Sequence, residues 1–211
     1  NGRPAGADDL LVSHGERVHL LLVDETLRDF HHLAPVAEAQ PGEYEASFMP
    51  ALNGNYRAWT AVLPVDTALQ EYLPAVLPGR EQAEGRIDRT TATTAEAGGL
   101  RFELLLHTPG QVRARHMQFM RLVVKDTAGQ PVERLEPFFA AFAHLTAFYD
   151  DLETVMQLHP TGGDILNADL RGGPMLPFKF FPPKPGFVRV FCQVQVGGQK
   201  ITAPFGLQVV E

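Results

Sequence analysis

The sequence predicts an all-β protein built from two tandem, antiparallel β-sandwich modules. Three observations support this fold class. One stretch of the chain is repeated further along, which indicates two related structural units. Short apolar segments are separated by 17 prolines and 19 glycines, a texture typical of strands joined by turns. Several segments also alternate apolar and polar residues, as strands with one buried face do.

The repeat is clearest between residues 18–35 and 143–160, which align without a gap at an offset of 125 residues. Both copies read as an apolar strand, an acidic turn and a return strand. Identical residues occupy five shared positions: His19/His144, Leu20/Leu145, Leu27/Leu152, Leu33/Leu158 and Pro35/Pro160. Internal repetition of this kind sets the architecture before any local prediction does.

The repeat extends in both directions. Upstream, Gly2 aligns with Gly129 at an offset of 127, so we expect two extra residues in the first copy before His19. Downstream, residues 53–64 match 185–195, and residues 73–77 match 203–207. This alignment pairs Tyr56 with Phe187 and Trp59 with Phe191.

These matches predict a first module at residues 1–79, a linker at 80–99 and a second module at 100–211. The linker has almost no large apolar residue and cannot bury enough surface to offset the entropy of ordering. Two apparent strands within residues 100–125 have no counterpart in the first module. We expect that the first module lost its leading strands, with any signal peptide, by processing or trimming. The alternative is a first module with fewer strands.

Ten strands are expected, at residues 18–23, 44–48, 56–63, 72–76, 101–106, 117–125, 144–148, 176–181, 187–196 and 205–210. Two dipeptides fit hairpin turns because glycine accepts positive φ: Gly54–Asn55 and Gly197–Gly198. Helix signals are weak. Residues 135–146 suit a helix or a strand, and short helical turns are expected at 26–30 and 151–156.

Composition excludes several functions. The net charge is −7 and the basic residues are scattered, so no nucleic-acid partner is expected. No apolar run is long enough to span a membrane, so no membrane insertion is expected from this segment. The single cysteine, Cys192, cannot form an intrachain disulfide and is expected to be a small buried hydrophobe. No catalytic motif is present, so we expect no catalytic residues and no enzyme.

The chain resembles bacterial secreted immunoglobulin-like modules, some of which accompany copper and heavy-metal handling systems. Three short motifs carry this resemblance in the second copy, at residues 144–145, 150–152 and 158–160, and their first-copy counterparts are His19, Asp24, Leu27 and His32. The resemblance implies two tandem immunoglobulin-like sandwiches in the periplasm or outside the cell. In that family the return strand ends in His-x-His-Pro, and each copy here keeps half of that pattern.

Histidine offers the best chemical lead. If residues 18–23 and 30–33 pair as antiparallel strands, His19 lies opposite the level of His32. Neutral imidazoles in such a cluster can bind copper or zinc. The candidate metal ligands are His14, His19, His32, His144 and His159. The alternative is that His19 and His144 are structural, each bonded to a loop carbonyl or to the acidic turn that follows.

The acidic turns at Asp24 and Asp150–Asp151 lack the spacing of a calcium loop and are better explained as turns. We therefore expect a non-catalytic, exported binding or scaffold protein without a resident cofactor, which holds a protein partner through exposed aromatic residues. The alternative is a periplasmic protein that binds copper or zinc through the histidines of the first module.

Overall fold

The computed structural model describes residues 4–79, 81, 85–107 and 111–211. The protein is all-β, as predicted: the described residues form fifteen strands and one short 3-10 helix, η1 (Ala7–Asp9). No described helix has the length and hydropathy needed to cross a membrane. The chain divides into two compact units, residues 1–88 and 89–211.

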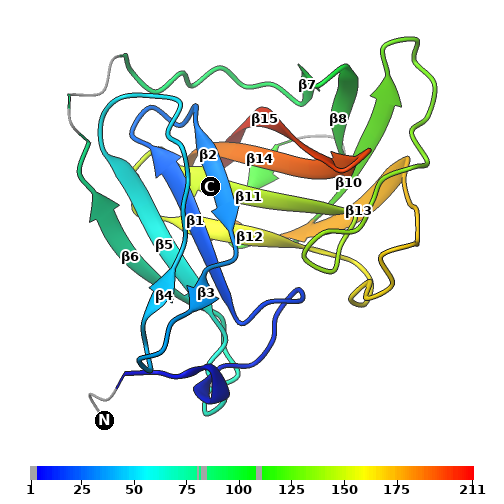
Figure 1. Ribbon diagram of the computed structural model, residues 1–211. Coiled ribbons are helices and arrows are strands. Elements are labelled where there is room, and N and C mark those ends of the chain that lie inside the picture. The colour runs from blue at the N-terminus through cyan, green and yellow to red at the C-terminus, as the bar shows by residue number, and fades with distance from the viewer. Residues whose placement is uncertain (1–3, 80, 82–84, 108–110) are drawn as a thin grey trace. The chain divides into compact units, whose positions relative to one another are not determined.

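Unit 1 is organised around a four-stranded antiparallel sheet in the order β2-β1-β5-β6, drawn in blue to teal in Figure 1. Its strands are β1 (Val18–Asp24), β2 (Phe30–Leu33), β5 (Tyr56–Val62) and β6 (Glu71–Leu77). A small second layer comes from β3 (Val36–Ala37), which pairs with β4 (Tyr44–Glu45). Tyr44 and Phe48 of this meander pack against apolar residues of the large sheet, so only part of that sheet is covered.

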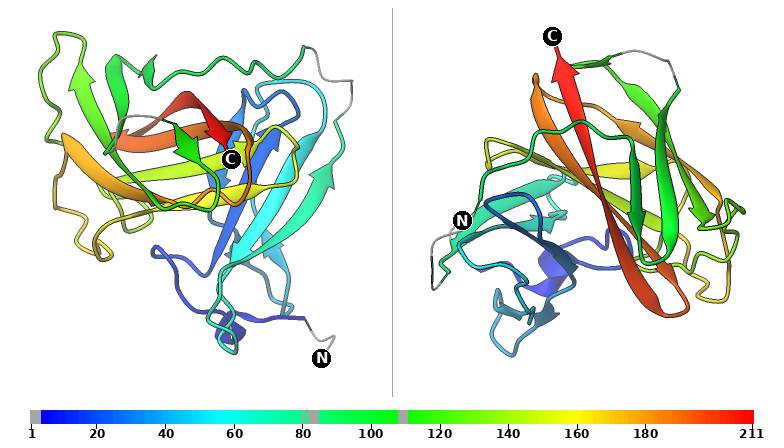
Figure 2. Two further views of the ribbon diagram at one scale, coloured as in Figure 1. Left: turned by 180° about the vertical axis from the view of Figure 1, so that it is seen from behind. Right: turned by 90° about the horizontal axis from the view of Figure 1, so that it is seen from above.

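Unit 2 has nine strands in one hydrogen-bonded order, β7-β8-β10-β13-β12-β11-β14-β15-β9, which curves round the unit in Figure 2. The strands are β7 (Thr94–Ala97), β8 (Leu100–Leu106), β9 (Val112–Arg113), β10 (Gln118–Asp126), β11 (Ala143–Tyr149), β12 (Val155–Pro160), β13 (Met175–Phe180), β14 (Gly186–Val196) and β15 (Gln199–Val210). All pairs are antiparallel except the short contact of β9 with β15.

One apolar core holds unit 2 together. It combines residues of β8, β10 and β13, such as Phe102, Leu122 and Phe178, with residues of β11 and β14, such as Leu145 and Val190. The two groups of strands therefore face each other across a shared interior, as in a β-sandwich. Cys192 lies in this core, fully buried, and burial raises the pKa of its thiol. The prediction of a small, unreactive hydrophobe at this position fits that environment.

The glycine pair Gly197–Gly198 joins β14 to β15, as predicted. Both residues have positive φ, 59° and 74°, which matches the type I′ turn that best suits a two-residue hairpin. The predicted hairpin at residues 54–55 is wrong, because β5 pairs with β1 and β6 rather than with β4. Residues 24–29 and 149–154 form tight turns in place of the expected helical turns.

The end of the predicted linker is also different. Thr94–Ala97 forms β7, an edge strand that pairs with β8. Its alanines, Ala95 and Ala97, pack against the core of unit 2 even though the segment contains no large apolar residue. An edge strand needs only a few small contacts and one hydrogen-bonded neighbour, so a lack of large side chains does not exclude a strand.

The repeat is present in the backbone. β1 pairs with β2 in the register Leu20↔Leu33, and β11 pairs with β12 in the equivalent register Leu145↔Leu158. The next strands are also equivalent: β5 pairs with β1 in the register Leu21↔Trp59, and β14 pairs with β11 in the register Thr146↔Phe191. Trp59 and Phe191 are therefore equivalent, as predicted.

One detail of the predicted alignment is wrong. Tyr56 is opposite Asp24, and Val188 is opposite Tyr149, so Tyr56 corresponds to Val188 rather than to Phe187. The two extra residues expected before His19 do not lie between Ser13 and His19. Ser13 exchanges backbone hydrogen bonds with Glu16, and Phe138 does the same with Ala141, at the unchanged offset of 125 residues. The described residues of unit 1 contain no counterparts of β8, β10 and β13.

Candidate functional site

His19 is a buried residue of β1, with 1% of its surface exposed. Its Nε2 lies 2.8 Å from the carbonyl oxygen of Ser13. Ser13 begins a tight turn in which His14 and Gly15 both have positive φ, 49° and 80°. Because a carbonyl only accepts hydrogen bonds, Nε2 of His19 must carry the hydrogen. The imidazole therefore ties the preceding turn to the sheet.

His32 is the second partner of His19. Nδ1 of His19 lies 2.9 Å from Nε2 of His32, and both side chains are buried. A neutral His19 that donates from Nε2 accepts at Nδ1, so Nε2 of His32 is the donor. Burial lowers the pKa of His19 and outweighs the opposite effects of the Ser13 carbonyl and of Glu16. Burial therefore favours a neutral His19 that accepts a hydrogen bond from His32.

His144 has the same environment in unit 2. Its Nε2 lies 2.8 Å from the carbonyl oxygen of Phe138, the residue equivalent to Ser13. Phe139 and Ala140, in the turn after Phe138, again have positive φ. The position equivalent to His32 is occupied by Gln157. Its amide can donate a hydrogen bond, but it has no imidazole nitrogen to bind a metal ion. A shared carbonyl contact with a variable second partner favours a structural role for His19 and His144.

The remaining candidate ligands are less well assembled. The ring centroid of His14 lies 6.5 Å from that of His19, and the centroid of His32 lies 5.0 Å from it. His159 is on β12, opposite Lys179 of β13, but its side chain lies outside the described part of the structure. Among the described residues, no group of three or more His, Cys, Asp or Glu side chains is placed to hold a metal ion.

Both acidic turns use their carboxylates internally. Asp24 is 1% exposed and accepts hydrogen bonds from the backbone amides of Thr26, Arg28 and Asp29 and from the Thr26 hydroxyl. Asp151 accepts from Glu153 and Thr154 in the equivalent turn. These carboxylate oxygens are occupied by turn donors, which supports the interpretation as turns rather than calcium ligands.

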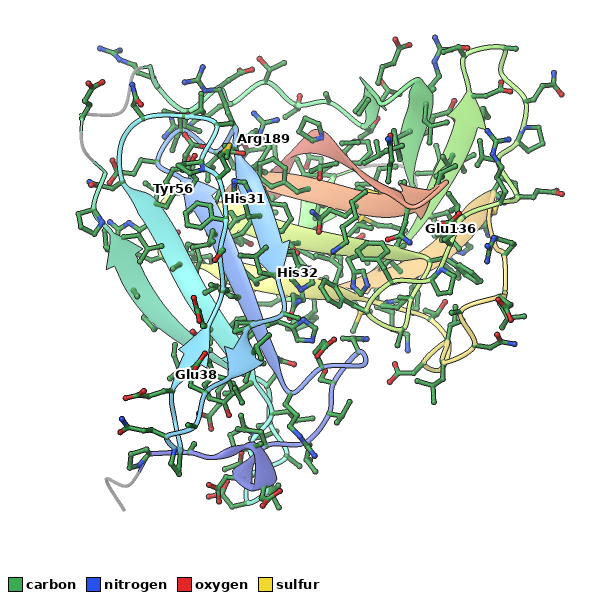
Figure 3. The ribbon with its side chains drawn as sticks, in the orientation of Figure 1. His31, His32, Glu38, Tyr56, Glu136 and Arg189 are labelled. Atoms are coloured by element: carbon green, nitrogen blue, oxygen red, sulfur yellow. The ribbon has the colours of Figure 1, made fainter. Side chains whose placement is uncertain are left out.

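A polar cluster around Asp29 was not predicted from the sequence. Its Oδ2 lies 3.0 Å from Nε2 of His31, and it accepts from the Tyr56 hydroxyl at 2.5 Å and from the Ala51 amide at 2.8 Å. Figure 3 shows His31 and Tyr56 together at one end of the unit 1 sheet. Only the two-residue spacing of Asp29 and His31 at the start of β2 signals this cluster, since Tyr56 and Ala51 are distant in sequence.

The Asp29 cluster fastens a loop. Burial raises the pKa of Asp29, but the hydrogen bonds from His31, Tyr56 and Ala51 outweigh burial and hold the pKa below its ordinary value. Burial and the neighbouring Asp29 carboxylate raise the pKa of Tyr56. Asp29 is therefore a stable anion that anchors residues 51–52 to the sheet.

A groove of about 420 Å³ lies on the face of the unit 1 sheet that the β3–β4 meander covers only in part, with Tyr44 in its wall. Its floor includes Val18 and Leu20 of β1, Thr60 and Val62 of β5, and Leu73 of β6. These residues are cross-strand neighbours, as the registers Leu20↔Thr60 and Thr60↔Leu73 show. The groove is therefore a continuous strip across three strands.

The equivalent strip in unit 2 is core. The residues at the same positions are all at most 1% exposed and belong to the apolar interior: Ala143, Leu145, Cys192, Val194 and Ala203. β8, β10 and β13 cover them. In unit 1, Leu73 is 53% exposed at the position of the fully buried Ala203. Leu20, Thr60 and Leu73 are thus more exposed than their counterparts in unit 2, whereas Val18 and Val62 are buried, as their counterparts are.

Two further features mark the groove. The Tyr44 hydroxyl at its wall is buried and has no hydrogen-bond partner among the described residues. A neighbouring hollow of about 590 Å³ shares Leu10, Val62 and Leu73 with the groove. Four carboxylates line that hollow: Asp8, Asp9, Asp66 and Glu71.

Comparison with known proteins identifies a family without assigning an activity. No curated protein matches the sequence. A family model described as a domain of unknown function, DUF8832, matches residues 94–211. The match starts at the first residue of β7 and covers every strand of unit 2, which is more than half of the chain. The chain belongs to the DUF8832 family.

Proposed function

We propose that this protein is a non-catalytic binding module that holds a partner protein on the partly covered face of the unit 1 sheet. One observation carries the proposal: Leu20, Thr60 and Leu73 are partly exposed in a groove of unit 1, at positions that form the interior of unit 2. A second layer of strands removes this surface from water in unit 2. In unit 1 a bound partner would do the same.

Surface chemistry supports a protein partner over a small molecule. The groove is lined mainly by apolar side chains, and the adjoining strand β6 exposes Leu73, Val76 and Leu77 by 38–53%. Clustered exposed apolar residues with a polar rim are typical of interaction sites.

Site-specific photo-cross-linking in the native cell tests this proposal. A photoreactive benzoylphenylalanine replaces Thr60 or Leu73 in the groove, and Leu105 serves as a control because it is exposed on unit 2. We expect one protein adduct, identified by mass spectrometry, from both groove positions and not from Leu105. Adducts of equal yield at all three positions, or none at the groove, would contradict the proposal.

Metal binding is the second candidate. The observation that favours it is the direct approach of the His19 and His32 imidazoles, with His14 beside them. Two imidazole nitrogens could take up Cu(I), Cu(II) or Zn(II) if the His19–His32 hydrogen bond opened. Titration of each ion into the wild type, His19→Ala, His32→Ala and the control His31→Ala tests it. Stoichiometric binding lost only in the first two variants would support a metal site.

Both candidates fit an exported protein. The expected location in the periplasm or outside the cell stays a prediction, which cell fractionation with an antibody against the chain would test.

A further inference from the structure

We infer that the partner of the unit 1 groove presents an extended, cationic strand with apolar residues, which adds to the open edge of β6. This inference rests on the proposed function and names the chemistry of the partner. Three independent features of unit 1 support it: the edge of β6, the charge around the groove and the Tyr44 hydroxyl.

The edge of β6 is open where the equivalent edge in unit 2 is paired. Val76 of β6 lies opposite Arg57, and Gly206 of β15 lies opposite the equivalent Arg189. Gly206 exchanges two backbone hydrogen bonds with Ala92, at 2.9 and 2.8 Å. Because the geometry of the sheets is the same, the N–H and C=O of Val76 point outward from the sheet edge.

Proline placement confirms this direction. Pro74 lies opposite Trp59, and Pro204 lies opposite Phe191 at the equivalent position. Proline has no backbone N–H, so it is tolerated in a strand where its backbone nitrogen faces away from the neighbouring strand. Residues two apart in a strand direct their N–H groups to the same side, so Val76 shares the outward side with Pro74. Among the described residues, β6 is the last strand of its sheet.

An added strand would lie next to exposed apolar side chains. Leu73 and Leu77 of β6 project to the groove side and are 53% and 38% exposed. Strand addition gains affinity from backbone hydrogen bonds and specificity from alternate side chains in adjoining pockets. A partner strand with an apolar residue at every second position would therefore fill the groove.

The charge around the groove selects a cationic partner. Residues 1–88 contain 14 acidic and 6 basic side chains, whereas residues 89–211 contain 11 and 12. Asp66 and Glu71 are exposed at the rim of the acidic hollow, next to β6, and no Lys or Arg lines either hollow. Complementary charge speeds association and excludes acidic competitors.

The Tyr44 hydroxyl gives a directional contact. A buried hydroxyl without a partner is destabilising relative to a satisfied one. A polar side chain of the bound strand that enters the groove would satisfy it. The groove therefore contains one polar point among apolar contacts, a combination that orients a ligand.

A labelled synthetic peptide of about eight residues, in which Lys alternates with Val and Thr, is the probe, a length typical of a strand. Fluorescence anisotropy with the full chain measures its affinity, and a peptide with Glu in place of Lys is the control. We expect binding of the Lys peptide that weakens as NaCl is raised, and no binding of the Glu peptide. Equal affinity for both peptides would overturn the inference.

Three variants locate the bound peptide. Val76→Pro removes an outward amide and should weaken binding about tenfold, the value of one lost hydrogen bond, whereas Val76→Thr should leave it unchanged. Reversal of two rim charges, Asp66→Lys with Glu71→Lys, should weaken binding at least tenfold. The matched reversal Glu153→Lys with Asp169→Lys in unit 2 should not. Tyr44→Phe should weaken binding several-fold without loss of stability. Trp59 fluorescence confirms that the unit 1 variants are folded, and hydrogen exchange confirms that the unit 2 control is folded.

The two proposals can fail separately. A protein adduct at Thr60 and Leu73, combined with no affinity for the Lys peptide or with no effect of Val76→Pro, would retain the groove as a binding face. The same outcome would overturn the inference that the partner presents a cationic strand. Absence of both the adduct and peptide binding would remove both.

Discussion

Unit 1 and unit 2 contain the same four-stranded arrangement with different surroundings. The order β2-β1-β5-β6 in unit 1 corresponds to β12-β11-β14-β15 in unit 2, with equal registers at the first hairpin. Unit 2 adds β8, β10 and β13 over one face, and among the described residues of unit 1 the β3–β4 meander covers part of the equivalent face. The same sheet can therefore form half of a closed core or leave a groove on one face, depending on what covers it.

The shared hairpin also shows how different side chains build one backbone. Leu27 and Leu152 both have positive φ, 56° and 58°, at the same point of the turn. The carboxylate that accepts the turn amides has moved, from Asp24 at the end of β1 to Asp151, two positions beyond the equivalent of Asp24. Either carboxylate satisfies turn donors that would otherwise need water.

The largest expected difference concerns Leu145 and Leu20. Leu145→Ala should destabilise unit 2 by about 3 kcal/mol, because it opens a cavity in a closed core. Leu20→Ala should cost about 1 kcal/mol, because Leu20 is only half-buried at the groove. Urea denaturation followed by Trp59 fluorescence reports unit 1, and hydrogen exchange reports unit 2. Equal costs would mean that the unit 1 face is as well covered as that of unit 2.

The second largest expected difference is in the stability lost when the two turn carboxylates, Asp24 and Asp151, are removed. Asp24→Ala leaves several buried amides without an acceptor and should cost about 2–3 kcal/mol. Asp151→Ala should cost about 1 kcal/mol, since Asp151 lies at the surface. Similar losses in the denaturation midpoints of the two variants would show that the two turns depend on their carboxylates equally.

Asp151 adds a pH signature. Burial opposes ionisation of Asp151, but the hydrogen bonds from Lys184, Glu153 and Thr154 prevail and lower its pKa to about 2. A pKa below the unfolded value of 3.8 gives stability that is complete above pH 4. That stability is lost as the pH falls through about 2, and Asp151→Asn should remove this part of the acid transition.

The fold was largely predictable from the sequence because the repeat and the alternation are local patterns. The offset between His19 and His144 predicted two equivalent hairpins, and Gly197–Gly198 predicted the turn between β14 and β15. The edge strand β7 was not predictable from hydrophobicity, because alanines and one hydrogen-bonded neighbour are enough to hold it.

The site was harder to predict. Sequence placed His32 near His19 correctly, since cross-strand pairing follows from a short hairpin. It could not show the groove, because Leu20 and Leu145 are identical residues at equivalent positions and only the covering layer separates them. It also missed Asp29, whose partners Tyr56 and Ala51 are more than 20 residues away.

The two left-handed leucines should respond in opposite directions to glycine. Leu27→Gly relieves about 1 kcal/mol of backbone strain but loses the burial of a side chain that is 1% exposed, for a net cost of about 1–2 kcal/mol. Leu152 is only half-buried, so Leu152→Gly should be neutral or slightly stabilising. Thermal denaturation of both variants measures the sign, and a clear loss at Leu152 would contradict the strain argument.

The smallest expected effect is the pH dependence that His19 gives to unit 1. Its pKa is lowered by burial in the folded state, so the unfolded chain takes up a proton first as the pH falls below about 6.5. Stability that is complete at neutral pH should therefore decline between pH 7 and 5. His19→Gln should flatten this decline, whereas the exposed His107→Gln should leave it unchanged. Urea titrations at several pH values, read by Trp59 fluorescence, would show it. An unchanged slope in His19→Gln would mean that folding does not lower the pKa of His19, and that burial does not hold this imidazole neutral.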